Sequence, residues 1–239
     1  MSQSSSTKTS GADVEEKNTT GKVIAEGVTI PNGEQKTKIK SGSTTENSTT
    51  RNLHRVIYTS SYDRGLEHAL RMWPDIKKAV PDAELHIFYG WQLFEKFYKD
   101  NASSMAWMNK MKEMMTYDGI TDHGRVPQEE LKDFMQTCAA WAYPTHFGEI
   151  SCITAMKAQA YGCEPVVVNY AALKETVQRG RKVEGDIYDE ETKEAFKKEL
   201  IDALQNPMTD EKRNEMIEWA TEQYSWLHVA GRWDAEFKS

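Results

Sequence analysis

The sequence predicts an α/β fold, in which helices cover both faces of a parallel sheet in a single Rossmann-like domain. Two observations support this fold class. Short apolar segments alternate with amphipathic segments of helical length from about residue 52 onward. The apolar segments contain few polar positions, as expected of strands that are buried on both faces. Alternation of this kind is typical of βαβ units, because parallel strands need a long crossover that is usually a helix.

Five strands are predicted by apolar, strand-length segments, at residues 55–59, 84–89, 119–123, 138–143 and 165–168. The helical segments between and after them show apolar side chains at helical spacing. They cover residues 65–80, 91–115 with an interruption around 101–104, a helix that starts at Pro127, a helix from near Glu149 to Gly162, and then 171–178, 190–205, 210–224 and 226–237. A sheet of this type binds ligands outside the carboxyl ends of its strands.

Composition changes most clearly near residue 52. Residues 1–51 are mostly polar and rich in Ser, Thr and Lys, so we predict a disordered or linker segment there. We predict that residues 52–239 form one Rossmann-like domain. The whole chain is 38% hydrophobic with a mean hydropathy of −0.71, which agrees with a core domain beside a polar segment.

Charge and cysteine content exclude several classes of protein. A net charge of −7 argues against nucleic acid as a partner. The three cysteines lack the spacing of metal ligands, and an odd number of them suits a reducing compartment. The chain contains no apolar run of transmembrane length and no signal-peptide core. We therefore expect a cytoplasmic protein without a metal or other cofactor.

Polar residues follow the first and third predicted strands. Ser61, Arg64 and Gly65 come after the first, where a guanidinium and a glycine at a helix start can bind an anion. An ordinary polar loop with a helix cap is an equally good interpretation. Residues 124–126 come after the third, where backbone groups could meet a base and Arg125 could add a second cation. Arg125 could equally form a surface ion pair.

The loop after the fourth strand is the most informative. Its predicted helix would offer free N–H groups and a positive dipole end to a phosphate. Glu149, on the first turn, would then accept hydrogen bonds from sugar hydroxyls, or would only stabilise the helix end. The N–H groups of residues 150–152 would meet the phosphate. His146 could act as an acid or base, or be structural. Lys157 interrupts an apolar run and could reach outward or into the cleft.

Several segments, in order, resemble the C-terminal, donor-binding half of GT-B glycosyltransferases of family 4, the group 1 transferases. The resemblance covers roughly residues 52–237. The matching segments are YTSSYDRGLE (58–67), PDAELHIFYG (81–90), HGRVPQEEL (123–131), YPTHFGEISCITAMKAQAYGCEPVV (143–167) and YSWLHVAGRW (224–233). The resemblance implies that the domain is one half of a GT-B fold.

The resemblance also implies roles for individual residues. Arg64, with Gly65 beside it, would hold the donor diphosphate, and Glu149 would contact the donor sugar as the first glutamate of an E-x7-E motif. The nucleobase would lie against the segment Gly124, Arg125 and Val126. The distal phosphate would meet the backbone amides of Ile150, Ser151 and Cys152. The second glutamate of the motif falls on Lys157, a cation that cannot accept hydroxyl hydrogen bonds. Lys157 would instead pair with a phosphate or with Glu149, or ribose recognition would differ.

The implied function is binding of a nucleotide-diphosphate sugar for retaining, metal-independent glycosyl transfer. Arg64 would stabilise the leaving diphosphate and Glu149 would orient the sugar. The acceptor-binding N-terminal domain of the family has no counterpart in residues 1–51, so we expect that a separate chain supplies it or that truncation has removed it. The alternatives are a non-catalytic nucleotide-sugar-binding or interaction module and, third, a nucleotide-sugar epimerase.

Overall fold

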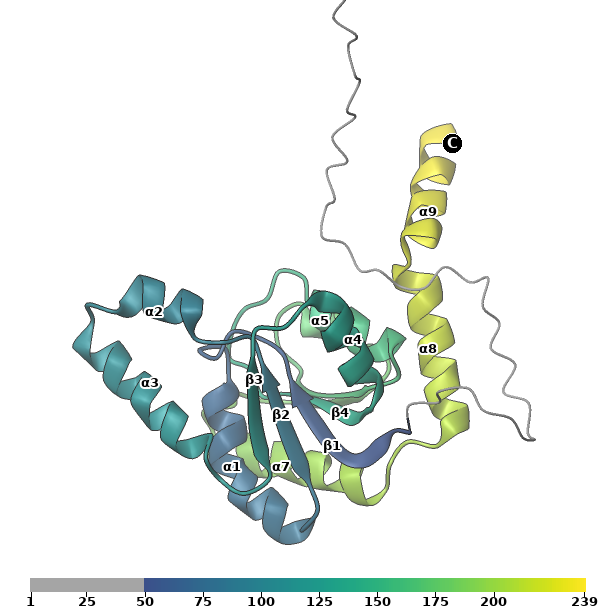
Figure 1. Ribbon diagram of the computed structural model, residues 1–239. Coiled ribbons are helices and arrows are strands. Elements are labelled where there is room, and N and C mark those ends of the chain that lie inside the picture. The colour runs from purple at the N-terminus through teal and green to yellow at the C-terminus, as the bar shows by residue number, and fades with distance from the viewer. Residues whose placement is uncertain (1–49) are drawn as a thin grey trace, which may run out of the picture.

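The computed structural model describes residues 50–239, so the disorder predicted for residues 1–51 lies almost wholly outside the described residues. The described chain contains a six-stranded parallel sheet with strand order β3-β2-β1-β4-β5-β6 (Figure 1). The fold class that the sequence predicted is thereby confirmed. The strands are β1 (Asn52–Tyr58), β2 (Glu84–Phe88), β3 (Ile120–Gly124), β4 (Cys138–Tyr143), β5 (Glu164–Val168) and β6 (Arg181–Val183).

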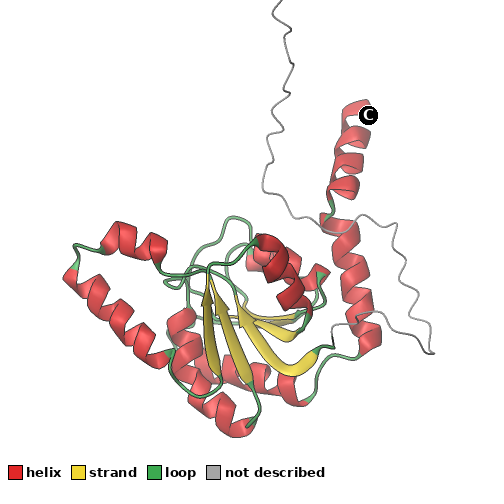
Figure 2. Cartoon of the chain, viewed as in Figure 1, coloured by secondary structure: helices red, strands yellow, loops and turns green. Residues whose placement is uncertain are grey.

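Helices lie on both faces of the sheet, as Figure 2 shows. The helices are α1 (Leu66–Ala79), α2 (Gln92–Tyr98), α3 (Ala102–Met114), α4 (Gln128–Gln136), α5 (Ile153–Ala160), α6 (Leu173–Thr176), α7 (Glu190–Gln205), α8 (Asp210–Tyr224) and α9 (Trp226–Lys238). Helix α7 packs on α1 and on the central strands, whereas α5 packs on β5 and α8. Helices α4 and α5 lie together on the side of the sheet away from α1 (Figure 1).

The strand order creates a crevice between β1 and β4. The chain runs from β1 outward to β3, then returns to β4 on the other side of β1 and continues outward to β6. The loops that follow β1 and β4 therefore leave neighbouring strands toward opposite faces. This switch point is where doubly wound sheets bind ligands.

The buried strand segments that the sequence predicted form the centre of the core, and helix side chains such as Trp73 and Phe196 complete it. Residues 56–58, all of β4 and all of β5 are buried. Two strand predictions need correction. Strand β1 begins at Asn52, three residues earlier than expected, because Asn52 pairs with Cys138 in β4. Strand β6 was not predicted, since it has only three residues, two of them cationic, and forms an edge of the sheet by pairing with β5.

The predicted helix start near Glu149 is wrong. Helix α5 begins at Ile153, and residues 144–152 form a loop. Bonds within and beside this loop occupy backbone groups that a helix would use. The Glu149 N–H donates to the Phe147 carbonyl at 2.9 Å, and the Glu149 carbonyl accepts from Ala172 N–H at 3.2 Å. The Phe147 N–H donates to Thr145 Oγ1 at 2.9 Å.

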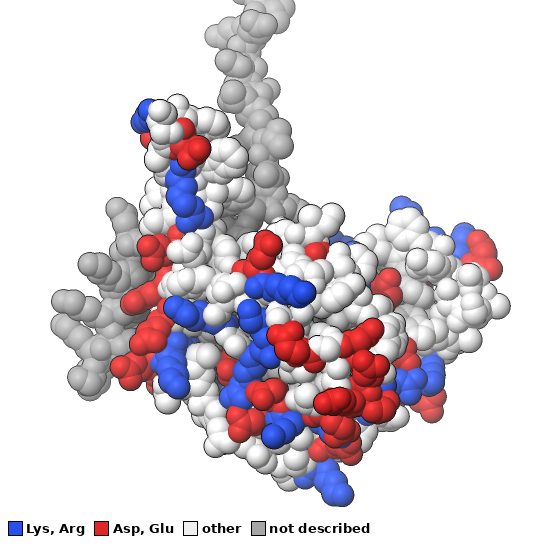
Figure 3. Space-filling model, turned by 180° about the vertical axis from the view of Figure 1, so that it is seen from behind, with Lys and Arg blue, Asp and Glu red and all other residues white. Residues whose placement is uncertain are grey.

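Helices α2, α3 and α9 extend away from the sheet (Figure 1). The interruption predicted between α2 and α3 is confirmed but falls at residues 99–101. It lies there because Asn101 caps α3, accepting a hydrogen bond from the Ser104 N–H at 2.9 Å. Neither α2 nor α9 buries a side chain. On the face seen from behind, acidic and basic side chains are interspersed (Figure 3).

Candidate functional site

Two loops meet at the carboxyl ends of β1 and β4, and each contributes one predicted site residue. Arg64 Nη1 lies 3.3 Å from Glu149 Oε1, across 85 positions of sequence. The Arg64 side chain is 36% exposed and that of Glu149 is 13% exposed. The Arg64 guanidinium also lies 3.9 Å from the centre of the Phe147 ring. The structure thus places a half-exposed cation and a more deeply set carboxylate at the switch point of the sheet.

Glu149 is held from below by Tyr143, the last residue of β4. The Tyr143 hydroxyl donates to Glu149 Oε1 at 2.7 Å and lies 3.2 Å from Ser60 Oγ. Tyr143 is fully buried, and this burial raises the pKa of its phenol above the ordinary value. The phenol therefore stays protonated and remains a hydrogen-bond donor to the carboxylate.

Gly65 allows the two loops to touch. Its φ of +117° lies in the left-handed region, which favours glycine. A Cβ at this position would lie 2.4 Å from the Pro144 carbonyl oxygen. Any side chain would therefore push the loop after β1 away from the loop after β4 and separate Arg64 from Glu149.

Two tyrosines brace the loop after β1. The Tyr58 hydroxyl donates to the Ser61 carbonyl at 2.9 Å. The Tyr62 hydroxyl donates to Asp122 Oδ1 at 2.7 Å and accepts from the Gly90 N–H at 3.0 Å. These bonds join the loop to the ends of β2 and β3. Sequence reasoning missed Tyr62 and Tyr143 as site residues, although a phenol at the end of a buried strand is a signal that could have found Tyr143.

The predicted nucleobase segment lies at the end of β3. Gly124 has a φ of +64°, and its N–H donates to Asp122 Oδ1 at 2.9 Å. Arg125 is exposed, and Val126 packs against the core. Although β2 separates β3 from β1 in the sheet, Tyr62 from the loop of Arg64 bonds to the same Asp122 Oδ1 as the Gly124 N–H, so the two loops meet there.

The three residues predicted to offer amides precede α5 instead of lying in its first turn. The Ile150 side chain is 98% exposed. Cys152 is the N-cap of α5, and burial raises the pKa of its thiol to about 12. The first-turn N–H groups of the helix therefore begin at Ile153, and those of Thr154 and Ala155 are directed at the Cys152 thiol. Lys157, farther along α5, points toward α4, where its Nζ donates to Gln128 Oε1 at 2.8 Å.

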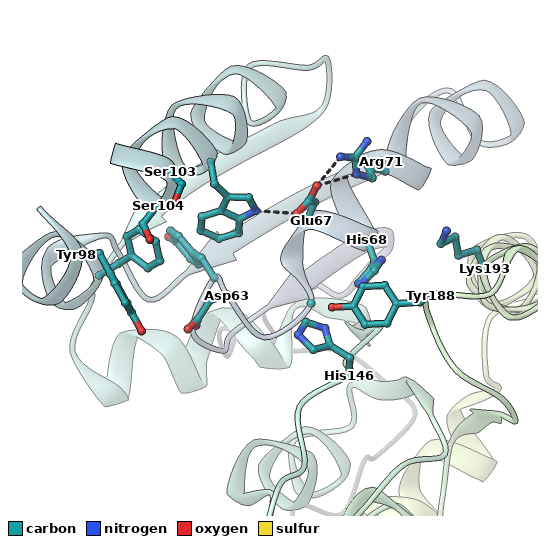
Figure 4. A pocket seen from close by; sticks show the side chains of 14 residues that line it. Asp63, Glu67, His68, Arg71, Tyr98, Ser103, Ser104, His146, Tyr188 and Lys193 are labelled. Carbon is teal, nitrogen blue, oxygen red and sulfur yellow. Dashed lines mark hydrogen bonds and ion pairs between the residues drawn. The ribbon is translucent and has the colours of Figure 1, made fainter. Parts of the chain in front are cut away.

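A hollow of about 670 Å³ adjoins the crevice, between α1, the α2–α3 projection and the start of α7 (Figure 4). His146 lines it, and the His146 and His68 ring centres are 5.8 Å apart. Burial and the neighbouring His146 lower the pKa of His68 to about 4, so His68 is neutral at neutral pH. Trp91 is buried against Tyr62, so it is a core residue and not an open platform for a ligand.

Within residues 50–239, no three His, Cys, Asp or Glu side chains are grouped so that they could hold a metal ion. None of the helices there combines the length and the apolar character that crossing a bilayer requires.

The sequence model of the family described as glycosyl transferases group 1 matches residues 45–223. The chain belongs to this family. The match spans the sheet, the loops of Arg64 and Glu149 and most of α8, and it confirms the family that the sequence motifs indicated. No curated protein matches the chain in sequence.

Solved glycosyltransferase structures resemble this group 1 domain in fold. The pneumococcal O-GlcNAc transferase GtfA, in complex with UDP and GlcNAc, matches with 14% identity and a TM-score of 0.59 over 81% of this chain and 37% of GtfA. A chain of the GtfA/B complex matches with 14% identity and a TM-score of 0.63, over 80% of this chain and 37% of that chain. HepE of Anabaena, in complex with UDP-glucose, matches with 12% identity and a TM-score of 0.59, over 77% of this chain and 48% of HepE. The chain thus spans less than half the length of these proteins.

Proposed function

We propose that this group 1 glycosyltransferase domain binds a nucleotide-diphosphate sugar in the crevice between β1 and β4, for retaining glycosyl transfer. The observation that carries the proposal is the meeting of Arg64 and Glu149 at the switch point of the sheet. The pair combines a cation for a diphosphate with an acceptor for sugar hydroxyls. The structural neighbours that were solved with UDP or UDP-glucose support this choice of ligand.

Arg64 is suited to bind the diphosphate. Its guanidinium can form two parallel hydrogen bonds to phosphate oxygens, and it is more than a third exposed while it pairs with Glu149. A diphosphate carries more negative charge than one carboxylate, so it would draw Arg64 from Glu149. The N–H groups at the start of α5, from Ile153, would add a positive dipole end at the same loop.

Glu149 is suited to orient the sugar. Among residues 50–239, its carboxylate accepts one short bond, from Tyr143 at 2.7 Å, apart from its pairing with Arg64. Release of Arg64 to the diphosphate would leave carboxylate lone pairs for sugar hydroxyls. Because Tyr143 fixes the position of Glu149, a hydroxyl of one particular orientation would be favoured.

In the transfer step, the bond between the anomeric carbon and the diphosphate oxygen breaks, and the diphosphate leaves with the electron pair. The acceptor hydroxyl bonds to the anomeric carbon on the same face, and its proton passes to the departing phosphate oxygen. Arg64 stabilises the charge that develops on this oxygen, which is electrostatic catalysis. This role needs no metal.

The acceptor would be held by a second domain, which we propose is supplied by another chain. Helix α9 is the described element most suited to contact it. Its exposed apolar side chains are Trp226, Leu227, Trp233 and Phe237, with exposures of 57%, 64%, 59% and 79%. Large apolar side chains that are exposed together on one helix commonly mark a protein contact.

Isothermal titration of the chain with UDP, GDP, ADP and their glucose conjugates tests the proposal. We expect one nucleotide series to bind, and Arg64→Ala to weaken its affinity by roughly tenfold or more, the loss expected for a hydrogen-bonded charge. Arg232→Ala, on the exposed helix α9, is the control and should bind as the wild type does. Absence of binding in every series, or wild-type affinity of Arg64→Ala, would contradict the proposal.

The second candidate is a non-catalytic nucleotide-sugar-binding or interaction module. The position of Lys157 favours it, since a cation that donates to Gln128 stands where the motif expects a ribose-binding carboxylate. Turnover separates the two candidates. The module hypothesis would be rejected if this chain, alone or with an added acceptor domain, transferred the sugar of a nucleotide sugar to an acceptor. Binding without turnover in either setting would favour it.

A further inference from the structure

The hollow beside the crevice has its own chemistry, and we propose that it binds a neutral oligosaccharide. We call it the aromatic trough. Its lining includes Asp63, Glu67, Tyr98, Ser104, Trp107 and His146. Figure 4 shows Tyr98, Ser103 and Ser104 at one end, Tyr188 and Lys193 at the other, and Asp63 and Glu67 between them. A row of this form suits an extended ligand better than a compact one.

The charge of the trough favours an uncharged ligand. Asp63 and Glu67 contribute two negative charges, and Arg71 and Lys193 contribute two positive charges, so the lining is neutral in sum. Arg71 Nε is paired with Glu67 at 2.9 Å, and Lys193 Nζ with Glu190 at 2.5 Å. A polyanion or a cation would therefore have to compete with existing ion pairs, whereas a neutral ligand would not.

The aromatic rings of the trough are fixed in place. The Trp107 indole N–H donates to Glu67 Oε2 at 2.7 Å. The Phe94 ring lies 5.2 Å from that of Trp107 and 4.7 Å from that of Tyr98. Tyr98 is 42% exposed, so one ring surface is open to a ligand. The apolar C–H face of a sugar ring can pack on such a surface and lose contact with water.

Polar groups beside the rings can bind hydroxyls. Asp63 is exposed and can accept hydrogen bonds, and the Ser104 hydroxyl can donate or accept. His146 also lines the trough, and an imidazole can donate or accept a hydrogen bond. Rings and hydroxyl-binding groups in alternation are the chemistry that a glycan requires. The volume of about 670 Å³ lies within the usual range for ligand sites.

The trough and the crevice share the same two loops. Asp63 and Gly65 flank Arg64 in the loop after β1, and His146 precedes Phe147 in the loop after β4. A glycan in the trough could therefore present a terminal hydroxyl to a sugar held at Glu149. The trough would then hold the acceptor glycan together with the second domain, a role that rests on the proposed function, whereas glycan binding by itself does not.

The test uses the full 239-residue chain and three neutral probes: maltotetraose, cellotetraose and tetra-N-acetylchitotetraose. Saturation-transfer NMR and calorimetric titration should show binding of at least one. Tyr98→Ala should weaken that binding about fivefold, which is the effect of losing one ring contact. Tyr117→Ala is the matched control, since Tyr117 is 40% exposed and lies outside the trough. Asp63→Asn, which preserves shape, should also weaken binding and serves as a second variant if Tyr98→Ala does not fold.

The outcomes separate this proposal from the proposed function. If the wild type binds none of the three probes, the trough proposal is overturned, whether or not the chain binds UDP. It is also overturned if Tyr98→Ala and Asp63→Asn both bind like the wild type, or if Tyr117→Ala weakens binding equally. If a probe binds in the trough but no nucleotide binds, the proposed function fails and the glycan site stands.

Discussion

Two arginines at opposite ends of the strands are held in different ways. Arg181, at the start of β6, contacts three carboxylates: Glu164 at 3.0 Å, Glu199 at 3.2 Å, and Asp202. Arg64, after the end of β1, has one carboxylate at 3.3 Å and an aromatic ring. The Arg181 side chain is 20% exposed, against 36% for Arg64.

The difference separates a structural cation from an available one. Glu164 is nearly buried, with 8% of its side chain exposed, and Arg181 supplies the charge that this carboxylate needs. Burial nevertheless raises the pKa of Glu164 above its ordinary value, even with Arg181 beside it. Arg64 neutralises no such deeply buried group, so it can change partners when a ligand arrives.

The largest expected effect is that of Arg181→Ala on stability. Removing this cation leaves Glu164 buried without a countercharge, so we expect the free energy of unfolding to fall by about 3 kcal/mol. Chemical denaturation measures it. The loss should shrink at acidic pH, because a protonated Glu164 needs no countercharge. A loss that is the same at neutral and acidic pH would show that packing, and not charge, explains the role of Arg181.

Gly65→Ala should be next in size. The new Cβ would lie 2.4 Å from the Pro144 carbonyl oxygen, at a φ of +117°. We expect a loss of stability of about 1–3 kcal/mol and weaker nucleotide binding, since the loops of Arg64 and Glu149 must separate. Gly148→Ala is the control, because a Cβ there meets nothing within 4 Å. Equal effects of the two substitutions would contradict the close contact between the loops.

Tyr143→Phe should have a moderate effect on stability and a specific one on the site. It removes the 2.7 Å bond to Glu149, which we expect to cost about 1 kcal/mol. Tyr224→Phe, which removes a bond to the Thr176 carbonyl, should cost a similar amount. Titration with a nucleotide and its sugar conjugate should show a smaller preference for the conjugate only in Tyr143→Phe. An unchanged preference would mean that Tyr143 does not position Glu149 for a sugar.

Arg64→Ala should change stability least, by less than about 1 kcal/mol, because the Arg64 side chain is more than a third exposed and Glu149 would keep its bond from Tyr143. Thermal or chemical denaturation beside Arg181→Ala completes the comparison. A loss from Arg64→Ala as large as that from Arg181→Ala would mean that Arg64 is a structural cation, and its use in ligand binding would then be in doubt.

Much of the fold could be predicted from local pattern. Residues 138–143 and 190–205 were predicted with the bounds that the structure shows, because continuous apolar character and helical periodicity are properties of the segment itself. Predictions failed where a distant contact decided the outcome. Strand β6 depends on pairing with β5, and the start of α5 depends on a loop whose Glu149 carbonyl bonds to Ala172.

The candidate site divides in the same way. The sequence alone predicted the fold class and the family, and it proposed Arg64 and Glu149 as candidate site residues, because strand ends and motif order can be read along the chain. Only the tertiary structure brought these two residues to 3.3 Å, placed Tyr143 beneath Glu149 and formed the aromatic trough. The physical reason is that each arrangement joins segments that are far apart in sequence, and packing of the sheet and its helices fixes their distance.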